Sequence, residues 1–396
     1  MRKSKKNWGL AGMFIAGIAL LGGLGGLLVS FVLPHLAGPE QAPAALMMAV
    51  GSLLIGIFAS IWLVIGWRVW RETPGLTFPA NTRDWVILLG LWLLLATLGL
   101  LLPERLQLTT PFALIHLAVV LLPAWLFLIF AGLAAGRGSL PSFTQLVSAM
   151  SGGLAATLPA FLLEMIGLLL IVLLVGGLAT LFPGGQAELA ELQAILQRWF
   201  QSQATSLPEQ ELLILLGSPL VLAVLLLILT LVAPLIEEFT KVWVVIVLCY
   251  RRQLSLAEAF LLGAASGLGF AILEGALNSI IGLGERWEWA AGVGMRLPAT
   301  AMHALTSGLI GLGWGYFWQR THRWLLPTAY LSALCIHGLW NFSTVGLVAS
   351  SAWLTQGTLA LPGGFVSLVS GGMLLLLIIL APLGLFGIPF WLRSRN

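Results

Sequence analysis

Two adjacent carboxylates and a lysine stand inside the almost wholly apolar stretch 211–250: Glu237, Glu238 and Lys241. Ionisable side chains at membrane depth cost about 2.5–3.5 kcal/mol each on insertion scales, so they are rare and usually line an ion path, a proton relay or a catalytic cavity. Glu237 and Lys241 are four residues apart on one helical face, where each can partly neutralise the other. A purely structural intramembrane ion pair is the alternative interpretation.

Three further apolar segments downstream carry polar or aromatic side chains at steps of four or seven residues, which places them on one face of each predicted helix. Small residues in the first of these segments, 263–278, let another helix approach closely. The residues singled out in the three segments are Phe270, Glu274, Asn278, Arg296, His303, Ser307, His337, Trp340 and Asn341.

The depth of the ionisable groups provides an independent test. At 1.5 Å per residue, those of the four segments lie about 20 to 25 Å from the cytoplasmic ends of their own predicted helices. Helices that run in opposite directions rarely agree in this way by chance. We therefore expect the four segments to bring their polar groups into one layer, at or slightly outside the membrane midplane.

Carboxylates, imidazoles and an amide in one buried layer suit the activation of water and the stabilisation of an oxyanion. The sequence contains no Gly-x-Ser-x-Gly elbow, and the absence of His-Glu-x-x-His excludes a zincin-type site. Another kind of zinc site stays open, because catalytic zinc takes three protein ligands and a water. The residues that could supply those ligands are His303, His337 and one of Glu237 or Glu274.

The composition defines the class of protein. Hydrophobic residues make up 59% of the chain and charged residues only 9%, which indicates a polytopic membrane protein. The apolar runs are continuous rather than alternating, so helices are expected to span the bilayer. The formal charge of +4 is small and predicts no nucleic-acid partner. Cys249 and Cys335 both fall in apolar segments, so neither a disulfide framework nor a cysteine metal motif is expected.

Polar breaks divide the chain into ten predicted spans. With the N-terminus inside, fourteen Lys and Arg residues lie on the inner side and four on the outer side. We therefore predict an all-α, polytopic transmembrane helix bundle with both termini in the cytoplasm, its first run retained as a span. The spans are 8–33, 44–67, 85–103, 112–135, 150–182, 212–249, 256–283, 297–318, 325–347 and 365–391.

Two runs are too long for one straight crossing. In 212–249, Pro234 stands where the helix would break or bend, directly before the glutamate pair. In 143–182, the start could form an interfacial helix, and Glu164 within the run is expected to be structural. Between these runs, the segment 187–200 has apolar residues at helical spacing, which predicts a helix at the outer surface.

The polar motifs, taken in order, resemble the PrsW family of intramembrane proteases, which shares a superfamily with the CAAX-processing prenyl proteases. The resemblance covers 211–347. The CAAX-processing pattern has His where Glu274 stands here. The resembling motifs are Glu-Glu-Phe-Thr-Lys, Phe-Ala-Ile-Leu-Glu-Gly-Ala-Leu-Asn, Arg-x6-His-Ala-Leu-Thr-Ser and His-Gly-Leu-Trp-Asn.

The resemblance implies proteolysis in or beside a plasma membrane of bacterial type, with a single-span membrane protein as substrate, such as a tethered anti-sigma factor. It divides the chain into an N-terminal membrane region of unknown role, 1–185, an extracytoplasmic loop or helix, 186–210, and a catalytic membrane domain, 211–396. The implied roles are general base for Glu237, its support for Glu238, a second water-binding group for Glu274, an oxyanion hole for His337 and Asn341, and positioning of water or substrate for His303.

Supporting roles are expected for Lys241, Phe270, Asn278, Arg296, Ser307 and Trp340. We expect water activated by glutamate without metal, because Lys241 beside the carboxylates opposes a dication. No cofactor is required by the sequence, and zinc stays possible.

Two other functions compete. A proton-coupled or ion-coupled transporter would also use intramembrane Glu, Lys and His, but it predicts paired broken helices in two related halves, and no such repeat is apparent in the sequence. A catalytically silent scaffold of the same superfamily is disfavoured because the full set of motifs is present.

Overall fold

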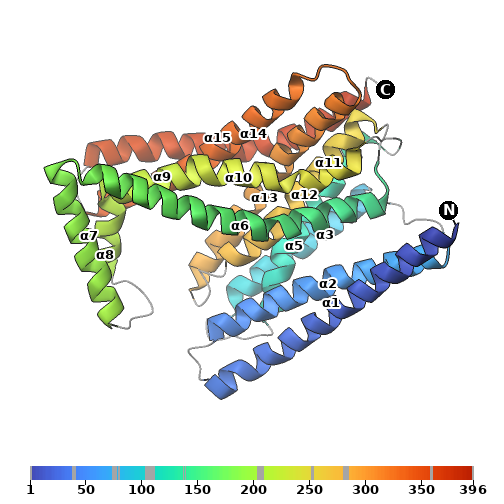
Figure 1. The fold of residues 1–396 in the computed structure, drawn as a ribbon, viewed down its shortest axis with the longest axis horizontal. Coiled ribbons are helices and arrows are strands. Elements are labelled where there is room, and N and C mark those ends of the chain that lie inside the picture. The colour runs from blue at the N-terminus through green and yellow to red at the C-terminus, as the bar shows by residue number, and fades with distance from the viewer. Residues whose placement is uncertain are drawn as a thin grey trace. The chain divides into compact units, whose positions relative to one another are not determined.

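The computed structural model describes residues 2–37, 42–73, 78, 81–102, 112–136, 138, 140–202, 209–250, 254–279, 285–356 and 360–394. These residues are helical almost throughout and contain no strand, which confirms the predicted all-α fold (Figure 1). In this part of the chain, nine helices are long and apolar enough to cross a membrane. The chain is therefore a multi-pass membrane protein.

The long helices follow the predicted spans. Helix α13 is not among the nine membrane-crossing candidates, because polar residues such as Arg296 and His303 interrupt its apolar run. The end of the predicted span 256–283 lies partly outside the described residues. The segment Pro219–Cys249 is the ninth candidate. The other eight are α1 (Arg2–Ala37), α2 (Ala42–Trp70), α3 (Thr82–Leu101), α5 (Phe112–Ala135), α6 (Phe143–Ala179), α12 (Leu256–Asn278), α14 (Leu325–Gln356) and α15 (Ala360–Arg393), and α13 is Arg286–Trp318.

Helix α6 is one unbroken helix that continues through Pro159. The start of this run therefore does not form a separate interfacial helix, which was one of the two possibilities for 143–182 in the sequence analysis. The segment predicted as a helix at 187–200 is part of α7 (Pro183–Ser202), which confirms that it is helical.

The long run that carries the glutamate pair is divided into five pieces. Ser218 caps the second piece by accepting a hydrogen bond from the Val221 N–H, and Pro219 fits its first turn. A π-helix then ends directly before Ala233. The chain stays helical through Pro234, the residue at which the sequence predicts a break or bend, so the irregularity there is a π-helical segment and not a gap in the helix. The pieces are α8 (Glu209–Gly217), α9 (Pro219–Leu226), the π-helix η3 (Leu227–Val232), α10 (Ala233–Lys241) and α11 (Trp243–Cys249).

The chain packs as two compact units. The first contains 1–155, 241–329 and 381–396, and the second contains 156–240 and 330–380. In the first unit α1 and α2 lie side by side (Figure 1), and α12 packs against α13 and α5. Most side chains of α12 are buried, so this helix forms the centre of the first unit.

Glycines bring the backbones of the first unit into direct contact. A Cβ atom added at Gly269 in α12 would lie 1.9 Å from the carbonyl oxygen of Met150 in α6. A Cβ atom added at Gly267 would lie 2.1 Å from the carbonyl oxygen of His303 in α13. Helices approach this closely only where a side chain is missing. The small residues of α12 therefore set the position of α13, which carries His303.

The orientation of the helices in the bilayer stays a prediction from the charge asymmetry. In a protein from which Cys249 and Cys335 have been replaced by Ser, a cysteine is introduced at Gln193 or at Arg320, both of which are exposed. We expect a thiol reagent that cannot cross the membrane to label intact cells at 193 and not at 320. The reverse labelling pattern would contradict the proposed topology.

Candidate active site

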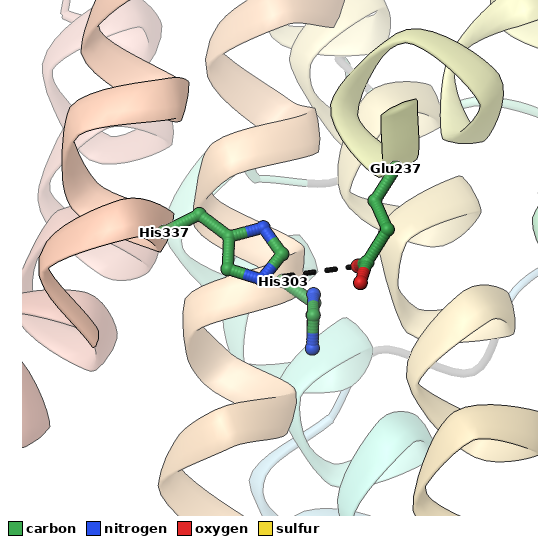
Figure 2. A group of neighbouring side chains, drawn as sticks. All are labelled: Glu237, His303 and His337. Carbon is green, nitrogen blue, oxygen red and sulfur yellow. Dashed lines mark ion pairs between the residues drawn. The ribbon is translucent and has the colours of Figure 1, made fainter. Parts of the chain in front are cut away.

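In the second unit, α10 presents two carboxylates to one histidine of α14. The Nδ1 atom of His337 lies 2.8 Å from Oε1 of Glu238, and its Nε2 atom lies 3.8 Å from Oε2 of Glu237 (Figure 2). All three side chains are buried. An ionised carboxylate only accepts, so Nδ1 of His337 donates to Glu238. In the neutral imidazole, Nε2 is then an acceptor that faces Glu237.

The sequence beside His337 explains why α14 comes so near to this part of the chain. A Cβ atom added at Gly338 would lie 2.6 Å from the carbonyl oxygen of Thr230 in η3. Asn341, one turn further along α14, donates from Nδ2 to the carbonyl oxygen of Leu229 at 2.7 Å. Trp340, which precedes Asn341 in the chain, is buried. The motif His-Gly-Leu-Trp-Asn thus packs α14 on the π-helix that precedes the glutamate pair.

In the first unit, a second histidine lies between a cation and a carboxylate. The Nδ1 atom of His303 is 2.8 Å from Nζ of Lys241, and its Nε2 atom is 2.7 Å from Oε2 of Glu274. An ammonium group only donates, so Nδ1 accepts and Nε2–H donates to Glu274. Nζ of Lys241 also lies 4.3 Å from the ring centroid of Phe270, a cation–π distance. Both ring nitrogens of His303 thus have a partner.

Glu274 has further partners on its other oxygen. Arg296 donates from Nη1 to Oε1 at 3.1 Å, and Asn278 donates from Nδ2 to the same oxygen at 2.9 Å. The structure therefore joins Glu274, Asn278, Arg296 and His303 in one hydrogen-bonded cluster. Ser307, one turn beyond His303, is buried. The charge of Glu274 is shared among three donors, an arrangement that orients His303.

One buried histidine of this unit was not identified from the sequence. His116 in α5 accepts from Nε1 of Trp289 at Nδ1 and donates from Nε2 to the carbonyl oxygen of Ala276, both at 3.2 Å. Ala276 lies two residues beyond Glu274 on α12. A lone histidine in an apolar run has no motif and no polar neighbour at helical spacing, so no sequence signal could have found it.

The family comparison decides the class of protein. Residues 144–370, more than half of the 396-residue chain, match the family described as PrsW family intramembrane metalloprotease. The chain belongs to the PrsW family. No curated protein and no solved structure matches it. Membership in the PrsW family confirms the resemblance found in the motifs and makes this protein an intramembrane protease, which disfavours the transporter alternative.

The PrsW family is described as a metalloprotease family, and the chain has buried residues of the types that zinc uses: Glu237, His303 and His337. In the second unit, the 3.8 Å between His337 Nε2 and Glu237 Oε2 is close to the spacing of about 3.4 Å expected for two ligand atoms on one tetrahedral zinc. In the first unit, Lys241 and Glu274 already hold both nitrogens of His303. Zinc at His303 Nδ1 would have to take the place of the Lys241 ammonium.

Proposed function

We propose that this PrsW-family protein hydrolyses a peptide bond of a single-span membrane protein, such as a tethered anti-sigma factor, in a bacterial-type plasma membrane with both termini in the cytoplasm. The observation that carries the mechanism is the buried His337 with Glu238 on one ring nitrogen and Glu237 facing the other. The histidine and both carboxylates stand on membrane-crossing segments, where such groups are retained for function.

We propose that residues of both histidine clusters take part in the reaction. The support is the continuity of α10, which carries Glu238, the partner of His337, and three residues later Lys241, the partner of His303. Residues three apart on a helix are neighbours on its surface. The common depth predicted from the sequence and the span of the family match, which includes α10, α12, α13 and α14, agree with this proposal.

In this mechanism Glu237 is the general base. Water placed between Glu237 and the Nε2 atom of His337 donates one hydrogen bond to each of these two acceptors and directs its oxygen at the substrate carbonyl. Glu237 takes the proton as the oxygen attacks the carbonyl carbon, and passes it to the amide nitrogen as the C–N bond breaks. Glu238 keeps His337 in the required tautomer. Lys241, which pairs with His303, is the cation that we assign to the developing oxyanion.

Zinc-dependent hydrolysis is the second candidate, and the family description and the His337–Glu237 spacing favour it. Glu237, His303 and His337 would hold the ion. An ion held there would supply Lewis-acid chemistry toward the substrate carbonyl and the attacking water. The pairing of both His303 nitrogens is the reason that we place the metal-free mechanism first, since a dication on either nitrogen would have to displace Lys241 or Glu274.

The test uses the purified full chain in proteoliposomes with a single-span substrate. We expect cleavage within or beside the membrane segment, mapped by mass spectrometry of both fragments. We also expect cleavage to continue after chelator treatment that removes all zinc, as measured by elemental analysis. Loss of cleavage on zinc removal, with recovery when zinc is returned, would overturn the metal-free mechanism in favour of the zinc site. Absence of any cleavage would contradict the proposed function itself.

A further inference from the structure

The π-helix before the glutamate pair creates a local shortage of hydrogen-bond donors. In η3 the N–H of Ala233 donates to the carbonyl oxygen of Ile228, five residues back. In the same pattern, the carbonyl oxygen of Leu229 would accept from residue 234. That residue is Pro234, which has no N–H. The helix itself therefore supplies no N–H to Leu229 at this register.

Asn341 of α14 supplies the missing donor. Its Nδ2 atom lies 2.7 Å from the carbonyl oxygen of Leu229. The side chain of Leu229 is exposed on the apolar surface of a membrane-crossing segment. In the hydrocarbon layer there is no water to donate to the Leu229 carbonyl, and a carbonyl oxygen without a donor costs several kcal/mol there. Gly338, one turn before Asn341, lets the two backbones come close enough for this bond, because an added Cβ would lie 2.6 Å from the Thr230 oxygen.

The π-helix also sets the direction in which α10 presents its side chains. A π turn contains one residue more than an α turn, and one residue corresponds to about 100° of rotation about a helix axis. If η3 changed to α-helical geometry, α10 would turn by about that angle relative to α9. Glu237 and Glu238 would then no longer face His337. The bond from Asn341 is thus made to the segment on which the catalytic orientation depends.

We propose that Asn341 is a positioning residue, which acts through the Leu229 carbonyl and not on the substrate. The proposal rests on the proposed function, and it replaces the oxyanion-hole role that the family resemblance implies for Asn341. The two roles differ in one respect that can be tested. A positioning residue becomes dispensable when the backbone receives another donor, whereas an oxyanion donor does not.

The experiment is a double-mutant cycle between Asn341 and Pro234. Asn341→Ala alone is expected to lower the rate of substrate cleavage at least about tenfold, because it leaves a carbonyl without its donor in a water-free setting. Pro234→Ala restores an N–H that can donate to Leu229, and alone it should leave cleavage within about threefold of the wild type. The double variant should cleave at the rate of Pro234→Ala.

A second measurement does not depend on cleavage. In thermal denaturation of the detergent-solubilised full chain, Asn341→Ala should lower the midpoint when residue 234 is Pro and should leave it unchanged when residue 234 is Ala. Asn278→Ala is the matched control, since Asn278 is also a lone amide on a helix face but bonds to Glu274. The Pro234→Ala change should not rescue any loss that Asn278→Ala causes.

The outcomes separate the two proposals. If the wild type cleaves and the double variant stays as slow as Asn341→Ala, the positioning role is overturned and Asn341 acts on the substrate. A folded Pro234→Ala variant that is itself inactive would also overturn it, because the restored N–H should be harmless. If the wild type does not cleave any single-span substrate, the proposed function fails, and the denaturation cycle still decides whether Asn341 supports the π-helix.

Discussion

Replacing Glu237 by Gln is expected to abolish cleavage of a single-span substrate while the protein stays folded and inserted. Gln has the size of Glu and keeps the packing around His337, but it cannot take a proton from water. Loss of a general base typically lowers turnover about 10²- to 10⁴-fold. The measurement is the initial rate of substrate cleavage in proteoliposomes, together with the thermal midpoint of the purified variant, which should stay near that of the wild type.

Glu164→Gln is the control for this prediction. Glu164 is also a glutamate in a membrane-crossing helix, α6, but it stands outside both histidine clusters described above. Its replacement should leave the cleavage rate within about twofold of the wild type, the range of a surface-type substitution. Equal activity in Glu237→Gln and the wild type would remove Glu237 from the mechanism, and equal losses in both variants would show that the assay reports membrane insertion and not catalysis.

The second large effect concerns stability. Gly269→Ala is expected to prevent α6 and α12 from packing, because the new Cβ would lie 1.9 Å from the backbone oxygen of Met150. Overpacking usually costs about 1–3 kcal/mol and more where, as here, the neighbouring atom is backbone and cannot rotate away. We expect this variant to aggregate on solubilisation or to denature at a much lower temperature than the wild type.

Gly90→Ala in α3 is the matched control, because among the described residues no atom outside the adjoining backbone of α3 lies within 4 Å of the Cβ position at Gly90. Removing a glycine from a helix interior without a steric clash stabilises the helix by about 0.5–1 kcal/mol. Size-exclusion profiles and thermal midpoints of the two variants should therefore change in opposite directions. A Gly269→Ala protein as stable as the wild type would mean that α6 and α12 do not cross as closely as described.

The sequence predicts the helices well where their ends are marked by polar residues. For α5, the predicted bounds 112–135 are the observed ones, since an uninterrupted apolar run ends there at a glycine and a charged residue. The π-helix could not be predicted in the same way. A single extra residue per turn leaves the apolar composition of 227–232 unchanged, so only the presence of Pro234 hinted that the helix would be irregular.

The partners of the site residues were harder to predict than their positions. Spacing of four residues suggested that Lys241 would act mainly on Glu237, but the structure places its Nζ atom 2.8 Å from His303, which is 62 residues away in the chain. A contact of this kind depends on how Lys241, at the end of α10, packs against α13, and single-sequence periodicity contains no information on it. The catalytic roles assigned to these residues stay predictions until the variants are measured.

The contacts of His116 have a consequence for how this protein can be divided. The family match begins at residue 144, yet α5, which precedes it, contributes the imidazole that joins Trp289 to the backbone of Ala276. A protein limited to residues 144–370 would leave the Trp289 indole and the Ala276 carbonyl oxygen without His116, the partner that they share. Ala276 is only two residues beyond Glu274 on α12. Exchanges of N-terminal segments between PrsW proteins should therefore keep α5 with the protease, because His116 on α5 bonds to residues inside the family match.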